Sequence, residues 1–245
     1  MTAAVRFHNL TLGYDRHPAV HHLDGAVQSG ALVALVGPNG AGKTTLLKGM
    51  VGLLPPLSGK IERSRAEVAY LPQVLEIDRS FPISVYDLVA LGLWRSAGLF
   101  GGISRQQRDS VAAAVATVGL QGFEARPIGT LSGGQMQRAL FARLLLQDAQ
   151  LILLDEPFAS IDSQTVRDLL EIVGRWHREQ RTVVAVLHDL DLVRARFPET
   201  LLLAREPVAW GPTREVLSAE NLLRARRMCE AFDETAEVCK EDAAA

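Results

Sequence analysis

Residues 37–45 constrain this chain more than any other stretch. Their order, Gly-Pro-Asn-Gly-Ala-Gly-Lys-Thr-Thr, fills every position of a phosphate-binding loop. A short apolar run, residues 31–36, comes directly before the loop, and a helix-like stretch, residues 46–50, follows it. Strand, glycine-rich turn and helix is the context in which such a loop holds phosphate. A glycine-rich turn that binds nothing would need neither the complete motif nor these flanks, so the sequence predicts nucleotide binding.

Each residue type in this loop has a chemical reason. The three glycines allow the backbone to turn tightly with its N–H groups directed inward, and the helix that begins near Lys43 adds its positive dipole end. We expect the ammonium of Lys43 to reach the β- and γ-phosphates, and the hydroxyl of Thr44 to hold Mg²⁺. The predicted nucleotide-binding residues here are Gly37, Pro38, Asn39, Gly40, Ala41, Gly42, Lys43, Thr44 and Thr45.

A second anion-binding helix start is predicted at residues 131–135, Leu-Ser-Gly-Gly-Gln, which open a helix running through Gln147. Ser132 suits an N-cap, and Gly133 and Gly134 leave the following backbone N–H groups exposed. An ordinary cap with a glycine turn is the alternative. The phosphate loop elsewhere in the chain favours the nucleotide-binding interpretation.

Carboxylates follow the continuous apolar run 151–154, which is typical of a buried parallel strand. The strand delivers Asp155 and Glu156 to its C-terminal end, where α/β sheets place their ligands. We expect Asp155 to hold Mg²⁺ and Glu156 to polarise a water for attack on the γ-phosphate, although two carboxylates could also form a surface turn. A second buried run, 183–187, ends at His188, which we expect at the same sheet edge as a donor to a phosphate oxygen.

Composition excludes several classes of protein. The 245 residues are 48% hydrophobic and 22% charged with a net charge of −2, which suits a globular protein and gives no sign of general nucleic-acid binding. No apolar run approaches the roughly 18 residues of a membrane span, and the N-terminus lacks a signal-peptide pattern. Two cysteines, Cys229 and Cys239, predict no disulfide framework and fit a reducing cytosol. The histidines at 17, 21 and 22 are expected in a loop and strand start, with a surface role rather than a metal site.

The pattern of elements predicts an α/β fold with a mostly parallel sheet, an N-terminal antiparallel β part and an inserted α-helical subdomain. We expect a single domain over 1–245, in which 1–80 and 147–245 form the nucleotide-binding core with the β part. Residues 81–146 form the helical subdomain and carry the Leu-Ser-Gly-Gly-Gln motif. Residues 201–204 and 208–210 predict a hairpin, and Ser218 begins a last helix.

These motifs, in this order, resemble the nucleotide-binding subunit of ATP-binding cassette transporters, and the resemblance covers nearly the whole chain. It implies that Tyr14 stacks on adenine and that Gln73 joins Thr44 and Asp155 around Mg²⁺. The catalytic residues that it implies are Lys43, Gln73, Glu156 and His188. It also implies a head-to-tail homodimer, in which residues of one subunit close over ATP held by the other: Ser132, Gly133, Gly134, Gln135 and Asp162. Ser160-Ile161-Asp162 departs slightly from the commoner Ala-Leu-Asp form but retains the aspartate.

A finer likeness points to the cassettes of zinc and manganese importers. It rests on Asp155-Glu156-Pro157-Phe158, Asp78-Arg79-Ser80-Phe81-Pro82 and His188-Asp189-Leu190. It implies an ATPase on the inner face of the cell membrane that works with an integral-membrane permease and, indirectly, with a periplasmic or extracellular solute-binding protein. An iron-chelate or cobalamin importer and a soluble non-transport cassette remain open alternatives.

Overall fold

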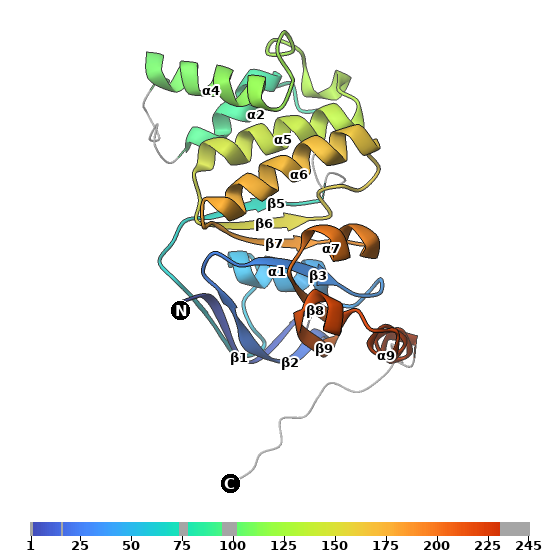
Figure 1. Cartoon of the computed structure of the whole chain (residues 1–245). Helices are drawn as coiled ribbons and strands as arrows, with labels where there is room; N and C mark the ends of the chain where they lie inside the picture. The colour runs from blue at the N-terminus through green and yellow to red at the C-terminus, as the bar shows by residue number, and fades with distance from the viewer. Residues whose placement is uncertain (1, 16, 74–77, 95–101, 231–245) are drawn as a thin grey trace. The chain divides into compact units, whose positions relative to one another are not determined.

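The computed structural model describes residues 2–15, 17–73, 78–94 and 102–230. Contacts within the chain group it into two compact units (Figure 1). The first unit comprises Met1–Arg65 and Val184–Ala245, and the second comprises Ala66–Val183. The strand β7 (Thr182–Val186) carries the chain from the second unit back into the first.

An antiparallel sheet opens the first unit. Strands β1 (Ala3–Tyr14), β2 (His17–Gln28) and β4 (Ser58–Arg63) pair in the order β2-β1-β4. The prediction that residues 17–22 lie in a loop and strand start was wrong in part, because β2 begins at His17. Tyr14 and His17 are cross-strand partners, and between them Asp15 takes a φ of 48° in the reversal of the chain. The antiparallel part itself is confirmed.

Parallel strands supply the rest of the first unit. The fully buried β3 (Leu32–Val36) lies parallel to β8 (Glu199–Ala204), and β9 (Glu206–Pro212) returns antiparallel to β8, which confirms the predicted hairpin. Beside β3 runs the end of β7, where the N–H of Leu187 donates to the carbonyl of Leu35 over 3.1 Å. The strand order in this unit is therefore β7-β3-β8-β9.

The helices of the first unit include two that the sequence did not predict. Helices α1 (Lys43–Val51) and α9 (Ala219–Glu230) lie where they were expected. The short helices α7 (Leu190–Arg196) and α8 (Thr213–Val216) were missed, because four to seven residues carry too little apolar periodicity to be recognised.

The second unit combines two parallel strands with packed helices. Strands β5 (Val68–Leu71) and β6 (Leu151–Asp155) pair in parallel. Helix α5 (Gly133–Gln147) contacts α2 (Val85–Ala90), α4 (Arg105–Thr117) and α6 (Ser163–Arg178), as Figure 1 shows. Short 3₁₀ turns, η2 (Leu91–Leu93) and η3 (Ile128–Thr130), precede α4 and α5.

Local sequence explains why these helices begin where they do. Serines at 84, 104 and 132 each form a capping box with the residue three positions later, so two backbone N–H groups are satisfied at each start. Aromatic rings then fix the packing, since the ring of Phe141 stacks against Trp176 with centroids 5.8 Å apart and against Phe158 at 6.5 Å. The predicted α/β fold with its helical insertion is confirmed, whereas the boundaries 81–146 stay a prediction.

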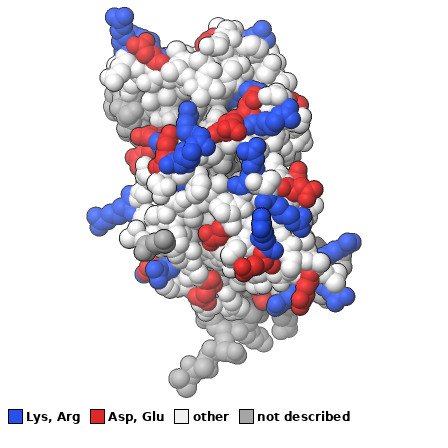
Figure 2. Space-filling view, viewed as in Figure 1, with Lys and Arg blue, Asp and Glu red and all other residues white. Residues whose placement is uncertain are grey.

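The surface carries both signs of charge. On the face drawn in Figure 2, Lys and Arg side chains alternate with Asp and Glu over the described elements. Within the described part of the chain, no helix combines the length and the apolar character that crossing a bilayer requires.

Candidate functional site

The loop between β3 and α1 is held in a tight curve by its neighbours in the first unit. A Cβ at Gly37 would collide with the carbonyl oxygen of Leu203, and one at Gly42, where φ is 89°, would collide with the carbonyl of Ala19. Only glycine therefore fits at these two positions. At Gly40 an added Cβ would meet nothing within 4 Å, so the tip of the loop is open.

The cation of Lys43 lies inside this curve. Its buried ammonium donates to the carbonyl oxygens of Gly37 at 2.9 Å and Pro38 at 2.8 Å. At the start of α1, the N-cap residue Gly42 supplies no side-chain cap to the first backbone N–H groups. A helix start of this kind beside an ammonium attracts an anion, so the loop fits a phosphate chain. Thr44 follows Lys43 and is half-buried.

The β8–β9 hairpin supports the loop from one side. At the hairpin turn, Arg205 takes a φ of 64°, and its N–H donates to the carbonyl of Ala41 over 3.0 Å. Its own carbonyl accepts from the N–H of His21 over 2.7 Å. These bonds connect the phosphate loop to both sheets of the first unit, which holds its backbone in place before any nucleotide binds.

Two predicted residues of the first unit lie where a nucleotide could meet them. Tyr14 ends β1 with 48% of its surface exposed, so a ring face is available for stacking. His188 is exposed two residues after β7 ends, and with Gly37 and Pro38 it lines one hollow. The structure therefore brings His188 to the phosphate loop. The contacts of both residues with nucleotide stay predictions.

The carboxylates of the second unit differ in their surroundings. Asp155 is buried at the end of β6, and the hydroxyl of Tyr70 on β5 donates to its Oδ2 at 3.5 Å. Glu156 is half-buried in a left-handed conformation, with φ 49°, which turns the chain out of the strand. Gln73 is half-buried two residues after β5 ends, and residues 74–77 beyond it lie outside the described part. Sequence reasoning missed Tyr70, because its only signal is its place on the strand paired with β6.

We predict that Tyr70→Phe weakens the use of Mg²⁺, since this hydroxyl holds a carboxylate that we expect to bind the ion. The Mg²⁺ concentration for half-maximal ATPase activity should rise about two- to tenfold. This is at or below the low end of the effect of removing a hydrogen-bond partner of a metal ligand, because the bond between Tyr70 and Asp155 is long. ATPase rates measured against free Mg²⁺ check this, with Tyr86→Phe on α2 as the matched control. An unchanged Mg²⁺ dependence would exclude a positioning role for Tyr70.

The Leu-Ser-Gly-Gly-Gln segment forms the start of α5, as predicted. The N–H of Gln135 donates to Ser132 Oγ over 3.2 Å, and Gln135 Oε1 accepts from the Ser132 N–H over 3.0 Å. At Gly133 and Gly134 the backbone is ordinary helix, and an added Cβ would make only ordinary contacts, the nearest at 3.4 Å. Packing within the chain therefore does not require glycine there, although glycine costs a helix roughly 1 kcal/mol relative to alanine.

Asp162 caps helix α6 next to this segment. Its carboxylate accepts from the backbone N–H groups of Gln164 and Thr165 and from the Thr165 hydroxyl at 2.7 Å. The hydrogen bonds from Thr165 lower the pKa of Asp162 most. Arg138 of α5 donates to Asp168 over 2.7 Å and to the Thr165 hydroxyl over 3.2 Å, which ties the two helices together. No local pattern in the sequence indicates this ion pair between Arg138 and Asp168.

Histidine, cysteine and carboxylate side chains of the described residues form no cluster of three or more that could hold a metal ion. The ligands that we expect for Mg²⁺, namely the oxygens of Thr44, Gln73 and Asp155, belong to the oxygen class that this ion prefers. The chemistry of each of these side chains is therefore compatible with a magnesium ligand.

Comparison with known proteins agrees with this site. The family model described as "ABC transporter" matches residues 20–159. The chain is 38% identical over 220 residues to the manganese transport system ATP-binding protein MntB of Listeria monocytogenes, covering 87% of this chain and 92% of that protein. It is 36% identical to the zinc transport system ATP-binding protein TroB of Treponema pallidum, covering 91% and 86%.

Among solved structures, a transporter described as of the metal-chelate ABC type, in an inward-facing conformation, superimposes with a TM-score of 0.82 at 29% identity. The match covers 92% of this chain and 90% of that chain. The family model spans more than half of the sequence, and the relatives span most of it. The chain therefore belongs to the ABC transporter family, as an ATP-binding subunit that hydrolyses ATP.

Proposed function

We propose that this protein is the ATPase that energises uptake of a divalent metal ion, manganese or zinc, through a separate membrane permease. The observation that carries the proposal is the likeness to ATP-binding proteins named for manganese and zinc transport, which extends over about nine-tenths of the chain. The side chains described above supply what ATP hydrolysis needs.

In the first unit, the phosphate loop and Lys43 bind the phosphates of ATP. The ammonium of Lys43, now bonded to two loop carbonyls, lies within reach of a phosphate chain seated on the loop. Tyr14 stacks on the adenine ring, and His188 donates to the γ-phosphate. Together these groups fix the nucleotide and stabilise the charge that develops on the transferred phosphoryl group.

In the second unit, the carboxylates have separate tasks. We assign Asp155 and Gln73, with Thr44, as the residues that hold Mg²⁺ directly or through water. Bound Mg²⁺ neutralises charge on the β- and γ-phosphates. Glu156 accepts a hydrogen bond from the attacking water and holds it in line with the phosphorus. Burial and the Tyr70 hydroxyl keep Asp155 in place, whereas Glu156 is less enclosed and can meet water.

The start of α5 is proposed to act on ATP held by a second subunit. Packing within the subunit does not require glycine at Gly133 or Gly134. Because glycine has no side chain, the helix N–H groups at these positions are left uncovered for an anion from outside the subunit. Ser132, Gln135 and Asp162 complete this surface in the head-to-tail homodimer that the resemblance to ABC cassettes implies. ATP then holds the two subunits together, and hydrolysis lets them separate. A permease bound to the subunits can change conformation between these closed and open states.

The proposed cargo and partners follow from the relatives rather than from the site. Phe158, part of the stretch in which the sequence resembles zinc and manganese importers, stacks against Phe141 and thus has a packing role in this chain. We propose a location on the inner face of the cell membrane, with the permease as direct partner and an external solute-binding protein as indirect partner. Importers of metal chelates are the second candidate, because the 29% identical structure is of that type.

We predict that a membrane permease is encoded beside this protein and that the two co-purify. In proteoliposomes, ATPase activity of the complex should rise severalfold when binding protein loaded with Mn²⁺ or Zn²⁺ replaces metal-free binding protein, because cargo engagement favours the closed state that hydrolyses ATP. Phosphate release measures this effect.

An iron chelate or cobalamin on its own binding protein is the control. Stimulation by that control alone would transfer the assignment to the chelate class. Full ATPase activity without any membrane partner, and no co-purification, would support a soluble non-transport ATPase instead.

A further inference from the structure

Residues 78–82 run beside the residues that lead into α5, and both segments belong to the second unit. Directly after this stretch, the carbonyl of Ile83 accepts from the N–H of Ile128 over 3.1 Å. A Cβ at Gly129 would lie 2.8 Å from the carbonyl oxygen of Arg79, so the two backbones are in contact there. The stretch therefore reaches the approach to α5 through its backbone.

Arg79 adds a side-chain bond to this contact. Its half-buried guanidinium donates through Nη2 to the carbonyl oxygen of Leu131. Leu131 is only 5% exposed, and its N–H donates to the carbonyl of Ile128 over 3.2 Å. Because Leu131 directly precedes Ser132, the N-cap of α5, the last residue before this cap is bonded at both of its backbone groups.

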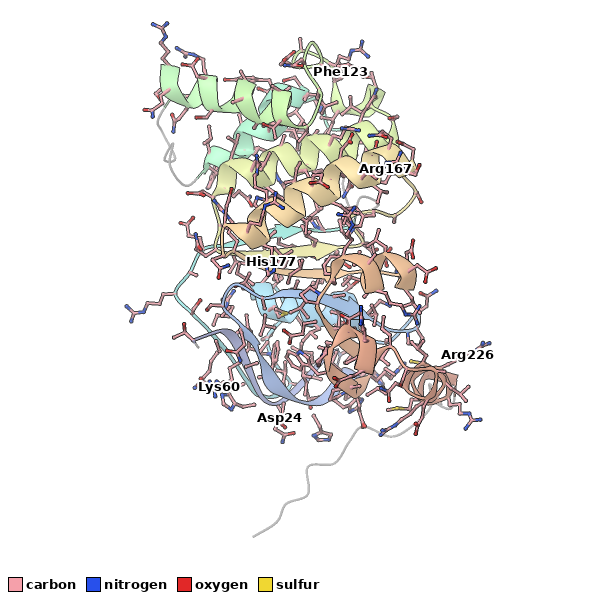
Figure 3. All side chains as sticks on the ribbon, viewed as in Figure 1. Asp24, Lys60, Phe123, Arg167, His177 and Arg226 are labelled. Atoms are coloured by element: carbon pink, nitrogen blue, oxygen red, sulfur yellow. The ribbon has the colours of Figure 1, made fainter. Side chains whose placement is uncertain are left out.

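Each side of the bond has its own local support. In the turn that contains Arg79, the carboxylate of Asp78 accepts from the N–H of Ser80 over 2.9 Å and from its hydroxyl over 2.6 Å. In the loop between α4 and α5, where Figure 3 labels Phe123, the guanidinium carbon of Arg126 lies 4.0 Å from the centroid of that ring. Removal of the Arg79 guanidinium should therefore loosen the junction with α5 without unfolding either segment.

The positive charge of Arg79 lies next to a helix N-terminus. The carbonyl that it bonds belongs to the peptide group that joins Leu131 to Ser132. A cation at this end is unfavourable for the helix alone, because the aligned peptide dipoles make the end positive. An anion bound there is attracted by both the dipole and the guanidinium. The arrangement therefore fits a helix start, with Ser132 and Gly133 exposed, that meets the phosphates of ATP.

We infer that Arg79 is a positioning residue for the start of α5, so that it acts on ATP bound by the partner subunit. The inference rests on the shared site of the proposed function. The order of residues along the chain favours the opposite assignment, because Arg79 follows Gln73 by six positions and Gln73 is expected at the Mg²⁺ of its own subunit. The bond to Leu131 connects Arg79 to α5 instead. The two assignments differ in which of the two bound ATP molecules is affected, and this difference can be measured.

Arg108→Ala is the matched control for Arg79→Ala. Arg108 donates to the carbonyl of Ile103 over 3.0 Å. Ile103 directly precedes Ser104, which caps α4 through the same kind of capping box. Each variant therefore loses a guanidinium bond to the last carbonyl before a capped helix, and both should lower the melting temperature by a similar, small amount.

Only Arg79→Ala should slow ATP hydrolysis. A misplacement of about 1 Å at a reacting group costs on the order of 100-fold in rate, so the loss of one of several bonds at the α5 start should lower kcat about tenfold. The affinity of the separate subunit for ATP should not change, because its phosphate loop is intact. An unchanged kcat in Arg79→Ala, or an equal loss in Arg108→Ala, would overturn the inference.

Mixing Arg79→Ala with Lys43→Ala in equal amounts, with ATP and Mg²⁺, shows which ATP is affected. If Arg79 serves the α5 start, one site of each heterodimer combines an intact phosphate loop with an intact α5 start. With random pairing and independent sites, phosphate release by the mixture should then be about fivefold above the mean of the two proteins measured separately. If Arg79 acts on the ATP of its own subunit, every site of the heterodimer is damaged. Phosphate release by the mixture would then equal that mean, which would overturn the inference.

A reference mixture of Lys43→Ala and Ser132→Arg distinguishes failure of the inference from failure of the shared site. If the reference mixture regains activity and the mixture with Arg79→Ala does not, Arg79 has no role at α5 and the proposed function stands. If neither mixture regains activity, the shared site is refuted and the inference with it. Should Arg79→Ala not fold, Arg79→Met keeps much of the apolar stem without a donor, and it should give the same result in the mixture with Lys43→Ala.

Discussion

The Glu156→Gln variant is expected to bind ATP like the wild type and to hydrolyse it about 10²–10⁴ times more slowly. Glutamine has the shape of glutamate but no negative charge, so it holds a water without increasing its nucleophilicity. The substitution suits the backbone at this position, since glutamine tolerates a φ of 49° about as well as glutamate and adds no branch at Cβ. Turnover should therefore fail while the ATP-bound dimer accumulates.

Three measurements check this result: phosphate release, the affinity for ATP, and the oligomeric state by size-exclusion chromatography with ATP and Mg²⁺. Glu215→Gln is the matched control, because it makes the same change of charge at an exposed position on α8. Near-normal hydrolysis by Glu156→Gln would remove Glu156 from its role. Loss of ATP affinity would show instead that the carboxylate holds the site together.

Local sequence predicted those parts of the fold that short-range physics determines. The phosphate loop follows from its glycines and flanking elements, because the required backbone conformations exclude most other residues. The start of α5 was predicted from Ser132 as the N-cap and from the two glycines after it, and the structure adds the reciprocal bond from Gln135. Buried strands such as β3 and β6 were recognised as continuous apolar runs, which is what parallel pairing requires.

Contacts between distant residues could not be predicted in the same way. Tyr70 and Asp155 are 85 positions apart, and Arg138 and Asp168 are 30 apart, so no local pattern connects them. Pairing of strands and packing of helices create these contacts only once the chain has folded.

The Ser132→Arg variant is expected to bind ATP but to lose turnover by at least about 100-fold, if α5 acts on ATP held by the other subunit. Arginine places bulk and charge at the position expected for the phosphates of the ATP that the partner subunit binds. The phosphate loop of the substituted subunit is unchanged, so that subunit still binds ATP. The exchange also removes the cap of α5, which costs about 1 kcal/mol. Ser132→Ala loses the same cap without the bulk, so it measures that cost separately. We expect Ser132→Ala to lower the melting temperature by roughly 2–4 °C and to retain far more activity than Ser132→Arg.

Mixing subunits shows whether the sites are shared. Lys43→Ala and Ser132→Arg homodimers should each be inactive, because every shared site contains one damaged component. In a heterodimer both changes fall in one site, since the phosphate loop of each chain faces the α5 start of the other. The second site is then assembled from an intact Lys43 and an intact Ser132, so activity should return on mixing. Full hydrolysis by the Ser132→Arg homodimer would contradict the shared site. It would show that each subunit completes its own phosphate pocket, so that Ser132 of the other subunit has no effect on hydrolysis.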